Sequence, residues 1–467
     1  MFYDILKFLA EDDIKLDEKL VPYEILSNEA HAIMLYKCGI ISQEDLRAIL
    51  MALEKIEELW CEGQLDLKLE FEDVHTNVEK LVISFAGSSG EKLHTARSRN
   101  DQVQVDLRMW MRDTILELAN CLVRLSDTLL KIAAEKLHVL MPAYTHLQPA
   151  QPSTLAHWLS AYAEAFIRDL ERLNQFWFRL NTLPLGAGAI CGTTLPIDRN
   201  ITAELLGFEG IQYNSLDVIS SRGELETELL MILSMIEMHI GRIVEDLILW
   251  SNPSFDFVKI QSKFCTGSSV MPQKRNPDTA EMLRAKVGRV HSSLIYALFI
   301  LKGLSTGYFR DMQETKWALF QGVETTIESI KILTEMISSL EFNEKRMKEV
   351  LNNGFYTATD LAELLVLKGV PFRLAYKIIK EFISLVEENG IEKEKWYDKL
   401  AEICEQYRIP FNLSKEEFME TLDAGKSILK RRFGGPSPDS VSWIIENSSR
   451  KLRDLNAVFK ERKRRLE

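Results

Sequence analysis

Apolar residues recur at spacings of three and four positions over most of the chain. The segments Leu46–Trp60 and Leu122–Leu137 show this spacing, which predicts amphipathic helices. Glu224–Trp250 stays apolar over more than half of its circumference for about seven helical turns. A helix of that length and composition belongs in the middle of a bundle or in a subunit interface.

The same pattern predicts the fold class and the division of the chain. Two further long helices are expected near Gln151 and near Asp278, whereas the alternation typical of strands is scarce. We therefore expect an all-α fold built around very long helices. Glycine- and proline-rich breaks, and a change to shorter helices near residues 352–355, divide the chain. The expected parts are an N-terminal helical domain over 1–105, a central long-helix bundle domain over 106–352 and a C-terminal helical domain over 353–467.

Composition limits the class of protein. With 467 residues, 46% of them hydrophobic and 27% charged, the chain can bury a core without disulfides or metals. A formal net charge of -12 disfavours nucleic acid as a partner, although a local basic patch can still bind a small anion. The six cysteines occur singly, which fits a reducing cytoplasm better than a disulfide framework or a zinc site. We find no signal peptide and no segment apolar enough to span a membrane.

The stretch TGSSVMPQKRNPD, residues 266–278, concentrates hydrogen-bonding groups in a chain that otherwise predicts helices. The glycine and serines at 267–269 permit close backbone approach and can present successive amides to an anion. We expect Asn276 to cap a helix whose first residue is Pro277, which would place Lys274 near the positive end of the helix dipole. A bound carboxylate would offset the repulsion between the Lys274 charge and the helix dipole. A generic serine-rich loop would have no need for a lysine at this position.

The stretch KLHTARSRNDQ, residues 92–102, holds a second cluster of donors. Arg97, Arg99 and Asn100 suit the recognition of a carboxylate. The alternative is a loop in which the serine, asparagine or aspartate at 98–101 caps the following helix. The spacing supports both interpretations about equally.

The stretch YTHLQPAQPSTLAHW, residues 144–158, places Thr145 and His146 just before two prolines and a long helix. A histidine beside a hydroxyl can act as an acid or a base near neutral pH. The alternative, a histidine whose ring bonds to the backbone of a turn, is the better interpretation of this stretch taken alone.

The stretch LKGLSTGYFRDMQETKWALF, residues 301–320, carries Tyr308, Gln313 and Lys316 around a break after a buried helix. These groups can form the wall of a pocket. A plain surface loop fits their spacing equally well.

Taken together, these stretches resemble one superfamily. GSSVMPQKRNPD is similar to the signature loop of the fumarase/aspartase superfamily, GSSxMPxKxNP, and meets each of its fixed positions. Within that superfamily the chain resembles the argininosuccinate lyase family, in the family's order and over nearly its whole length. The segments that carry this resemblance are SNEAHAIML, EDVHTNVE, KLHTARSRNDQV, THLQPAQP, LPLGAGAICG, MPQKRNPD, GYFRDMQETK and ATDLAELLVLKGVPFR.

The resemblance implies a fold, an assembly and a reaction. The fold would be the three-domain fumarase/aspartase-like one, in a homotetramer whose long helices form a 20-helix core and whose active sites are each shared between three subunits. The implied reaction is the reversible β-elimination of argininosuccinate to arginine and fumarate in arginine biosynthesis, through a carboxylate-stabilised carbanion and without cofactor or metal. The alternatives are a sister lyase that releases fumarate from adenylosuccinate or aspartate, and a non-catalytic crystallin-like homologue.

The resemblance also implies roles for individual residues. Ser268 and His146 would be the catalytic acid/base pair. Serine is a very weak base that needs a positive surrounding, whereas histidine is matched to neutral pH, so either could take the carbon proton; we favour Ser268 as the group that contacts substrate carbon. Glu281 would orient Lys274 or His146 from behind. The implied substrate-binding residues are Ser27, Arg99, Asn100, Thr145, Lys274, Asn276, Tyr308, Gln313 and Lys316.

Three segments depart from the family pattern. The first residues lack the usual WGGRF, the segment after Arg222 reads GELETE, and Tyr376 replaces a frequent histidine. None of these departures touches the residues implied in catalysis. They bear on substrate specificity, while the signature loop is still expected to close over the substrate and exclude water.

Overall fold

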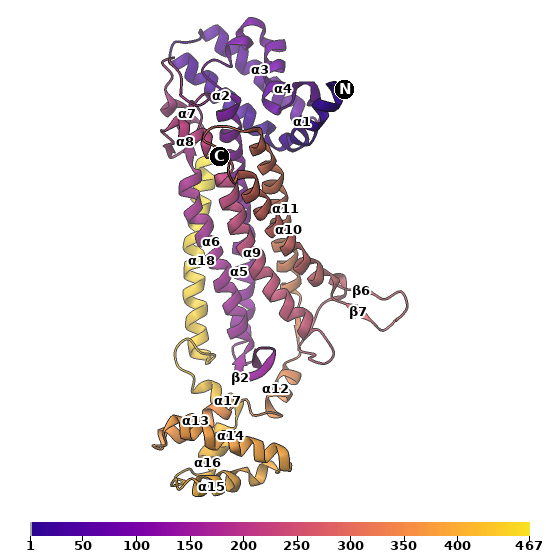
Figure 1. The fold of residues 1–467 in the computed structure, drawn as a ribbon, viewed down its shortest axis with the longest axis vertical. Coiled ribbons are helices and arrows are strands. Elements are labelled where there is room, and N and C mark those ends of the chain that lie inside the picture. The colour runs from indigo at the N-terminus through magenta and orange to yellow at the C-terminus, as the bar shows by residue number, and fades with distance from the viewer. Residues whose placement is uncertain (1) are drawn as a thin grey trace.

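In a computed structural model, which describes residues 2–467, the chain is dominated by helices. Figure 1 shows three tiers, with short N-terminal helices at one end, long helices side by side in the middle and short C-terminal helices at the other end. The N-terminal tier contains α1 (Phe2–Asp17), α2 (Val21–Lys37), α3 (Gln43–Cys61) and α4 (Val74–Ala86).

The middle tier confirms the expectation of very long helices. α9 begins and ends where the apolar pattern does, and α5 has 37 residues, which corresponds to a length of about 55 Å. Two short helices, α7 (Arg199–Leu205) and α8 (Ser215–Ser220), lie in the connection before α9. The long helices are α5 (Arg99–Glu135), α6 (Leu155–Leu180), α9 (Glu224–Trp250), α10 (Asp278–Leu301), α11 (Thr315–Ser338) and α18 (Pro438–Leu466).

The C-terminal tier has a hydrophobic cluster of its own, in which Phe382 and Phe418 are fully buried. After it, α18 returns to the middle tier and packs against α5 and α6. The short helices here are α13 (Ala358–Leu367), α14 (Phe372–Asn389), α15 (Trp396–Gln406), α16 (Lys415–Thr421) and α17 (Ala424–Leu429), while α12 (Glu344–Asn352) packs on β1 at the end of the bundle. The division into three domains at residues 105 and 352 stays a prediction.

Local sequence explains where the long helices begin. Ser98 caps α5 and forms a capping box with Asp101, so the capping role foreseen for residues 98–101 is confirmed. The Thr154 side chain accepts a hydrogen bond from the His157 backbone N–H and caps α6 in the same way. The bundle core is built from fully buried apolar side chains, among them Leu122 and Phe166.

Four short strand pairs interrupt the helices formed by residues 2–467. Three pairs are antiparallel and one, β3 with β4, is parallel. Two of the antiparallel pairs are local hairpins that carry candidate site residues, β1 with β2 and β6 with β7. The strands are β1 (Leu140–Thr145), β2 (Gln148–Thr154), β3 (Thr182–Leu183), β4 (Gly210–Ile211), β5 (Val258–Lys259), β6 (Thr266–Gly267), β7 (Arg275–Asn276) and β8 (Glu341–Phe342).

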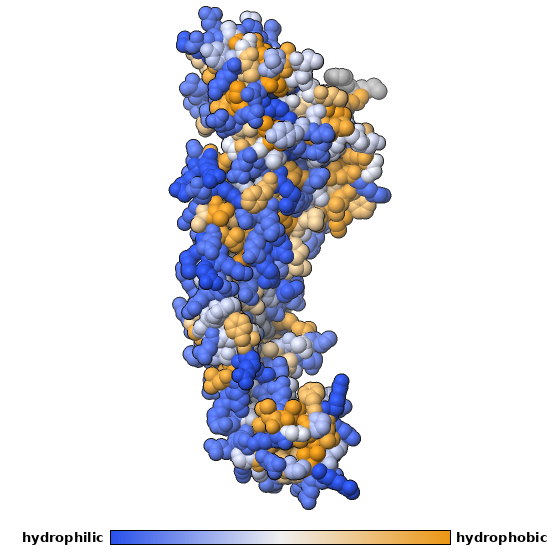
Figure 2. All heavy atoms as spheres, turned by 90° about the vertical axis from the view of Figure 1, so that its left-hand side faces the viewer, coloured by the Kyte–Doolittle hydropathy of each residue, from blue (hydrophilic) through white to orange (hydrophobic). Residues whose placement is uncertain are grey.

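The surface of a single chain exposes large apolar side chains on its long helices. On α10, Met282, Ile295 and Phe299 are 57%, 54% and 69% exposed. Figure 2 shows one face of the molecule, on which hydrophilic side chains cover much of the long-helix tier and apolar patches lie toward both ends. None of the helices formed by residues 2–467 has the length and apolar character needed to cross a membrane.

Candidate active site

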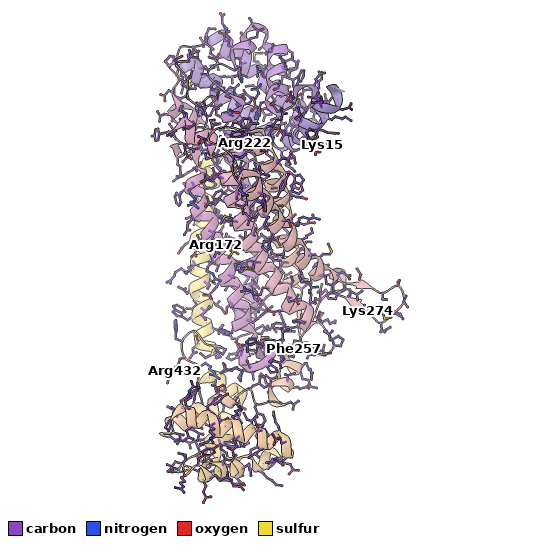
Figure 3. The ribbon with its side chains drawn as sticks, viewed as in Figure 1. Lys15, Arg172, Arg222, Phe257, Lys274 and Arg432 are labelled. Carbon is purple, nitrogen blue, oxygen red and sulfur yellow. The ribbon has the colours of Figure 1, made fainter. Side chains whose placement is uncertain are left out.

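Ser268 lies in the loop of a hairpin that projects from the side of the bundle (Figure 1). Its Oγ accepts hydrogen bonds from the backbone N–H groups of Val270, at 3.2 Å, and Met271, at 3.0 Å. Lys274 is exposed near the tip of the same hairpin (Figure 3). A β-carbon at Gly267 would meet no atom within 4 Å, so the loop is open around its glycine.

The start of α10 differs from the sequence expectation. Asn276 belongs to β7 and pairs with Thr266, while Pro277 is the N-cap of a helix that begins at Asp278. The expectation that Asn276 caps the helix is therefore wrong, because the hairpin holds its backbone extended. Asp278 instead accepts a hydrogen bond from the Thr266 N–H at 3.0 Å and another from the Thr266 hydroxyl.

Glu281 was expected to orient Lys274 or His146 from behind, and the contacts of the hairpin do not test this role. Glu281 is exposed in the first turn of α10. The carboxylate that ties the base of the hairpin to α10 belongs to Asp278, whose pKa is lowered by the hydrogen bond from Thr266. The role of Glu281 stays a prediction.

Thr145 and His146 lie at the tip of the β1–β2 hairpin, and both are exposed. Thr145 pairs with Gln148, so His146 and Leu147 form the turn, with φ values of 55° and 56°. Positive φ at two successive residues that are not glycine is uncommon. This turn presents the His146 ring to the outside.

Arg99 and Asn100 open α5 at the other end of the bundle. The Arg99 guanidinium forms an ion pair with Glu79 and donates from Nη1 to Gln102 Oε1 at 2.6 Å. Asn100 Nδ2 donates to the Ala189 carbonyl at 3.1 Å. The Asn100 contact places the start of α5 against the glycine-rich segment 183–196, and the Arg99 ion pair joins the start of α5 to α4.

Ser27, on α2, is fully buried, and its hydroxyl donates to the Glu24 carbonyl at 3.1 Å. Its neighbour Asn28 is also buried, and Asn28 Oδ1 accepts from Arg97 Nη1 at 2.7 Å. In this structure the hydroxyl of Ser27 therefore forms its hydrogen bond inside the N-terminal tier and does not face solvent.

Lys316 is almost completely buried at the start of α11. Its Nζ lies 2.6 Å from Asp13 Oδ1 and 2.5 Å from Asp17 Oδ1, both on α1. Burial opposes the charge, but the two carboxylates raise the pKa of Lys316, so it stays an ammonium ion. Gln313 donates to the other oxygen of Asp13 at 3.0 Å, and the Tyr308 ring lies 5.3 Å from the Arg222 guanidinium carbon.

One chain therefore holds the candidate residues in separate places. The Arg99 cluster and the Lys316 cluster lie at the N-terminal end of the bundle, whereas the Ser268 and His146 hairpins lie farther along it. Figure 3 shows this separation through Arg222 and Lys274. Over residues 2–467 no hydrogen bond or ion pair joins either hairpin loop to the N-terminal clusters.

Comparison with known proteins identifies the family. The sequence model of the family described as "Lyase" matches residues 10–292, and the one described as "Argininosuccinate lyase C-terminal" matches residues 355–428. The argininosuccinate lyase of Acetivibrio thermocellus is 42% identical over 435 residues, 93% of each chain. The chain belongs to the argininosuccinate lyase family. The argininosuccinate lyase of Acinetobacter baylyi is 41% identical over 96% of this chain and 94% of its own length.

Solved structures confirm the fold expected of an argininosuccinate lyase family member. A variant of EDDS lyase with bound fumarate has a TM-score of 0.88 at 27% identity, over 97% of this chain and 90% of that one. The class II fumarase of Schistosoma mansoni, at 17% identity, has a TM-score of 0.72 over 87% of this chain and 90% of that one, which supports the fold alone. The expected all-α, fumarase/aspartase-like fold is confirmed.

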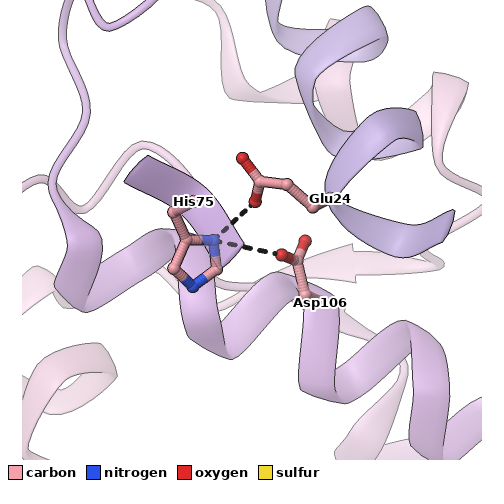
Figure 4. Close-up of side chains that lie close together, drawn as sticks. All are labelled: Glu24, His75 and Asp106. Atoms are coloured by element: carbon pink, nitrogen blue, oxygen red, sulfur yellow. Dashed lines mark hydrogen bonds and ion pairs between the residues drawn. The ribbon is translucent and has the colours of Figure 1, made fainter. Parts of the chain in front are cut away.

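Sequence reasoning missed one group of buried polar residues beside the Arg99 cluster. Glu24, His75 and Asp106 meet between α2, α4 and α5, and none of them is more than 3% exposed. Figure 4 shows both carboxylates directed at one ring nitrogen of His75. The available signal was that His75 lies in EDVHTNVE, one of the segments similar to the argininosuccinate lyase family.

Proposed function

We propose that this chain is an argininosuccinate lyase that cleaves argininosuccinate into arginine and fumarate in arginine biosynthesis. The observation that carries this proposal is the open loop around Ser268, in a chain of the argininosuccinate lyase family. That loop carries the Ser268 hydroxyl and the exposed ammonium group of Lys274, and the space around Gly267 is open to a substrate. These are the groups that an elimination beside a carboxylate requires.

The chemistry assigns a role to each group in the loop. Removal of the proton beside a carboxylate leaves two negative charges on that carboxylate, so fixed donors and the Lys274 charge would stabilise the carbanion. Two amide N–H groups donate to Ser268 Oγ, and hydrogen bonds of this kind favour the ionised form of the acceptor. This arrangement supports Ser268 as the base toward carbon and His146 as the partner that carries a proton on the other side.

The remaining candidates would hold the rest of the substrate. Arg99 and Lys316 are cations suited to carboxylates, and the other groups supply neutral donors and acceptors. For Lys316 to contact the substrate, its ion pairs with Asp13 and Asp17 must break or lengthen. The substrate-binding residues we propose are Ser27, Arg99, Asn100, Thr145, Lys274, Asn276, Tyr308, Gln313 and Lys316.

The assembly that we propose is a homotetramer in which three subunits contribute to each active site and the long helices form a common core. The separation of the hairpins from the Arg99 cluster in one chain supports it. So do the exposed apolar side chains of α10, such as Phe299 at 69% exposure, since an apolar patch of this kind marks an interaction surface. The unpaired cysteines fit a cytoplasmic location.

An assay of fumarate release tests this proposal. Purified protein is mixed in turn with argininosuccinate, adenylosuccinate and aspartate, and the ultraviolet absorbance of fumarate is followed. We expect turnover with argininosuccinate alone. Turnover with another of these substrates instead would identify a sister lyase, and no turnover with any of them would identify a non-catalytic homologue.

A further inference from the structure

Glu24 is the centre of a buried hydrogen-bond network beneath the Arg99 cluster. Its Oε2 lies 2.6 Å from His75 Nδ1. Its Oε1 accepts from Asn28 Nδ2 at 2.6 Å and from Gln102 Nε2 at 3.2 Å. One carboxylate thus receives donors from three helices, α2, α4 and α5, at a site where Glu24 is 1% exposed.

The side-chain amides of Asn28 and Gln102, which donate to Glu24, each also accept a hydrogen bond from an arginine. Asn28 Oδ1 accepts from Arg97 Nη1 at 2.7 Å, and Gln102 Oε1 accepts from Arg99 Nη1 at 2.6 Å. An amide has its NH₂ group and its oxygen on opposite sides. Because each NH₂ group faces Glu24, each oxygen must face its arginine.

We propose that Glu24 is a positioning residue of the substrate site, which orients Arg99 through Gln102 and Arg97 through Asn28. The inference rests on the proposed function, in which Arg99 binds a substrate carboxylate. A carboxylate can only accept hydrogen bonds, so Glu24 permits one orientation of each amide. An amide in place of Glu24 would permit the reverse orientation, in which NH₂ groups meet the guanidinium groups.

The neighbours of Glu24 keep it in the ionised form. Burial opposes its charge, but the charge and hydrogen bond of His75 lower the pKa of Glu24. Asp106 Oδ2 lies 3.5 Å from the same His75 nitrogen, and burial together with the Glu24 charge holds the pKa of Asp106 well above its usual range. Protons therefore reside on His75 and Asp106, and Glu24 is left as the acceptor.

The trio of Glu24, His75 and Asp106 is surrounded by charged groups that favour this distribution of protons. Asp17 and Asp73 face His75 and, although burial acts against the imidazolium, add to the effect of Glu24 in raising the pKa of His75. Arg97 is a buried cation beside Glu24, and the nearby His31 ring has a lowered pKa because of its burial and the Arg97 charge. The negative charge of Glu24 is thus balanced by two neighbouring cations, His75 and Arg97.

A metal ion is the alternative occupant of this trio, whose ligand atoms lie within 4.8 Å of one another. A histidine that binds a metal ion must offer the lone pair of a ring nitrogen that carries no proton. The distance of 2.6 Å between His75 Nδ1 and Glu24 Oε2 is that of a hydrogen bond with a proton between the atoms. The amide donors already present on Glu24 Oε1 leave the hydrogen-bonded network as the better description.

The test compares Glu24→Gln with the charge-conserving double variant Glu24→Gln/Gln102→Glu in argininosuccinate cleavage. In the single variant, the new NH₂ group faces the amides of Asn28 and Gln102, so Arg99 Nη1 loses its acceptor on Gln102 while the ion pair of Arg99 with Glu79 remains. We expect the KM for argininosuccinate to rise by roughly tenfold or more, with a smaller change in kcat. The double variant returns an acceptor to Arg99 and should recover most of that rise.

Glu29→Gln is the matched control, because Glu29 lies half-buried on the same helix and, among the described residues, its side chain shares no hydrogen bond or ion pair with the network. It should leave KM unchanged. A wild-type KM in Glu24→Gln would overturn the inference, as would a fall in Tm without a change in KM or a failure of the double variant to recover. Loss of wild-type activity on treatment with EDTA would favour a metal at the trio.

Crystal structures separate this inference from the proposed function. If the wild-type protein does not cleave argininosuccinate, the proposed function is wrong, and the orientation of Arg99 decides the inference by itself. We expect the Arg99 Nη1 contact with Gln102 Oε1, 2.6 Å long in the native chain, to be lost in Glu24→Gln. Its persistence there would overturn the inference whatever the activity.

Discussion

Lys316 Nζ lies 2.5 Å from Asp17 Oδ1, and this ion pair joins α11 to α1 across 299 positions of sequence. Asp13 completes the site at 2.6 Å, and each of the three side chains is at most 9% exposed. A buried charge depends on its partners, because removal of one partner leaves the others without compensation. Lys316 therefore fixes the first helix to the bundle as well as being a candidate for substrate contact.

Lys316→Ala should destabilise the protein strongly. It leaves Asp13 and Asp17 buried side by side, at a cost of about 3–5 kcal/mol, and it should release α1 to proteolysis. Lys331→Ala is the control on the same helix, because Lys331 pairs with Glu117 and both side chains are about half exposed; its cost should stay below about 1 kcal/mol. Thermal unfolding measures both. Equal Tm values in the two variants would show that the buried pair does not stabilise the fold.

Ser268→Ala should lower kcat for argininosuccinate by on the order of 10² or more, with the oligomer unchanged. The reason is chemical, since within residues 2–467 the side chain of Ser268 forms hydrogen bonds in its own loop alone, with the N–H groups of residues 270 and 271. Ser269→Ala is the matched control, one position away and exposed, and should retain more activity. Loss of assembly with activity retained would contradict the proposed role.

The stability of the bundle should depend on the ionisation of Glu237. Burial raises the pKa of Glu237 from 4.5 to about 7, and within residues 2–467 neither of its carboxylate oxygens has a hydrogen-bond partner. Below pH 4.5 the group is protonated in both the folded and the unfolded state, so it has no effect. As the pH rises to 7, only the unfolded state releases the proton, and the folded state loses about 3 kcal/mol of stability.

Glu237→Gln should remove this dependence. The Tm of the variant should equal that of the wild-type protein near pH 4.5 and exceed it near pH 8, as measured by thermal unfolding across that range. Glu328→Gln, on an exposed glutamate of α11, serves as the control and should leave the pH profile unchanged. A wild-type profile in Glu237→Gln would show that the buried carboxyl does not titrate in this range.

The sequence could predict what depends on local spacing. α9 was predicted to the residue because its apolar positions repeat along one segment, and the cap at Ser98 was among the predicted ones because it acts within a few residues of itself. The β1–β2 hairpin was missed, because Pro142, Pro149 and Pro152 obscure any strand pattern there.

Contacts between distant segments were the part that could not be predicted. Asn276 was misplaced as a helix cap because its partner Thr266 holds it in a hairpin. The motifs supplied Arg99 as a candidate, but neither the Glu24 network below it nor the pairing of Lys316 with α1 has any signal in local spacing. Long-range pairing of polar groups is decided by the folded core and not by neighbours in sequence.

A shared active site predicts that two inactive variants can restore each other. Ser268 lies in the projecting hairpin and Asn100 at the start of α5, which one chain keeps apart. When Ser268→Ala and Asn100→Ala chains are unfolded together and refolded, some sites in mixed tetramers should combine an intact hairpin from one chain with an intact Asn100 from another, so fumarate release should return. Mixing Ser268→Ala with Lys274→Ala should restore nothing, because both changes lie in the same hairpin and no site can then receive an intact loop. Recovery in neither mixture would mean that each site is built by a single chain.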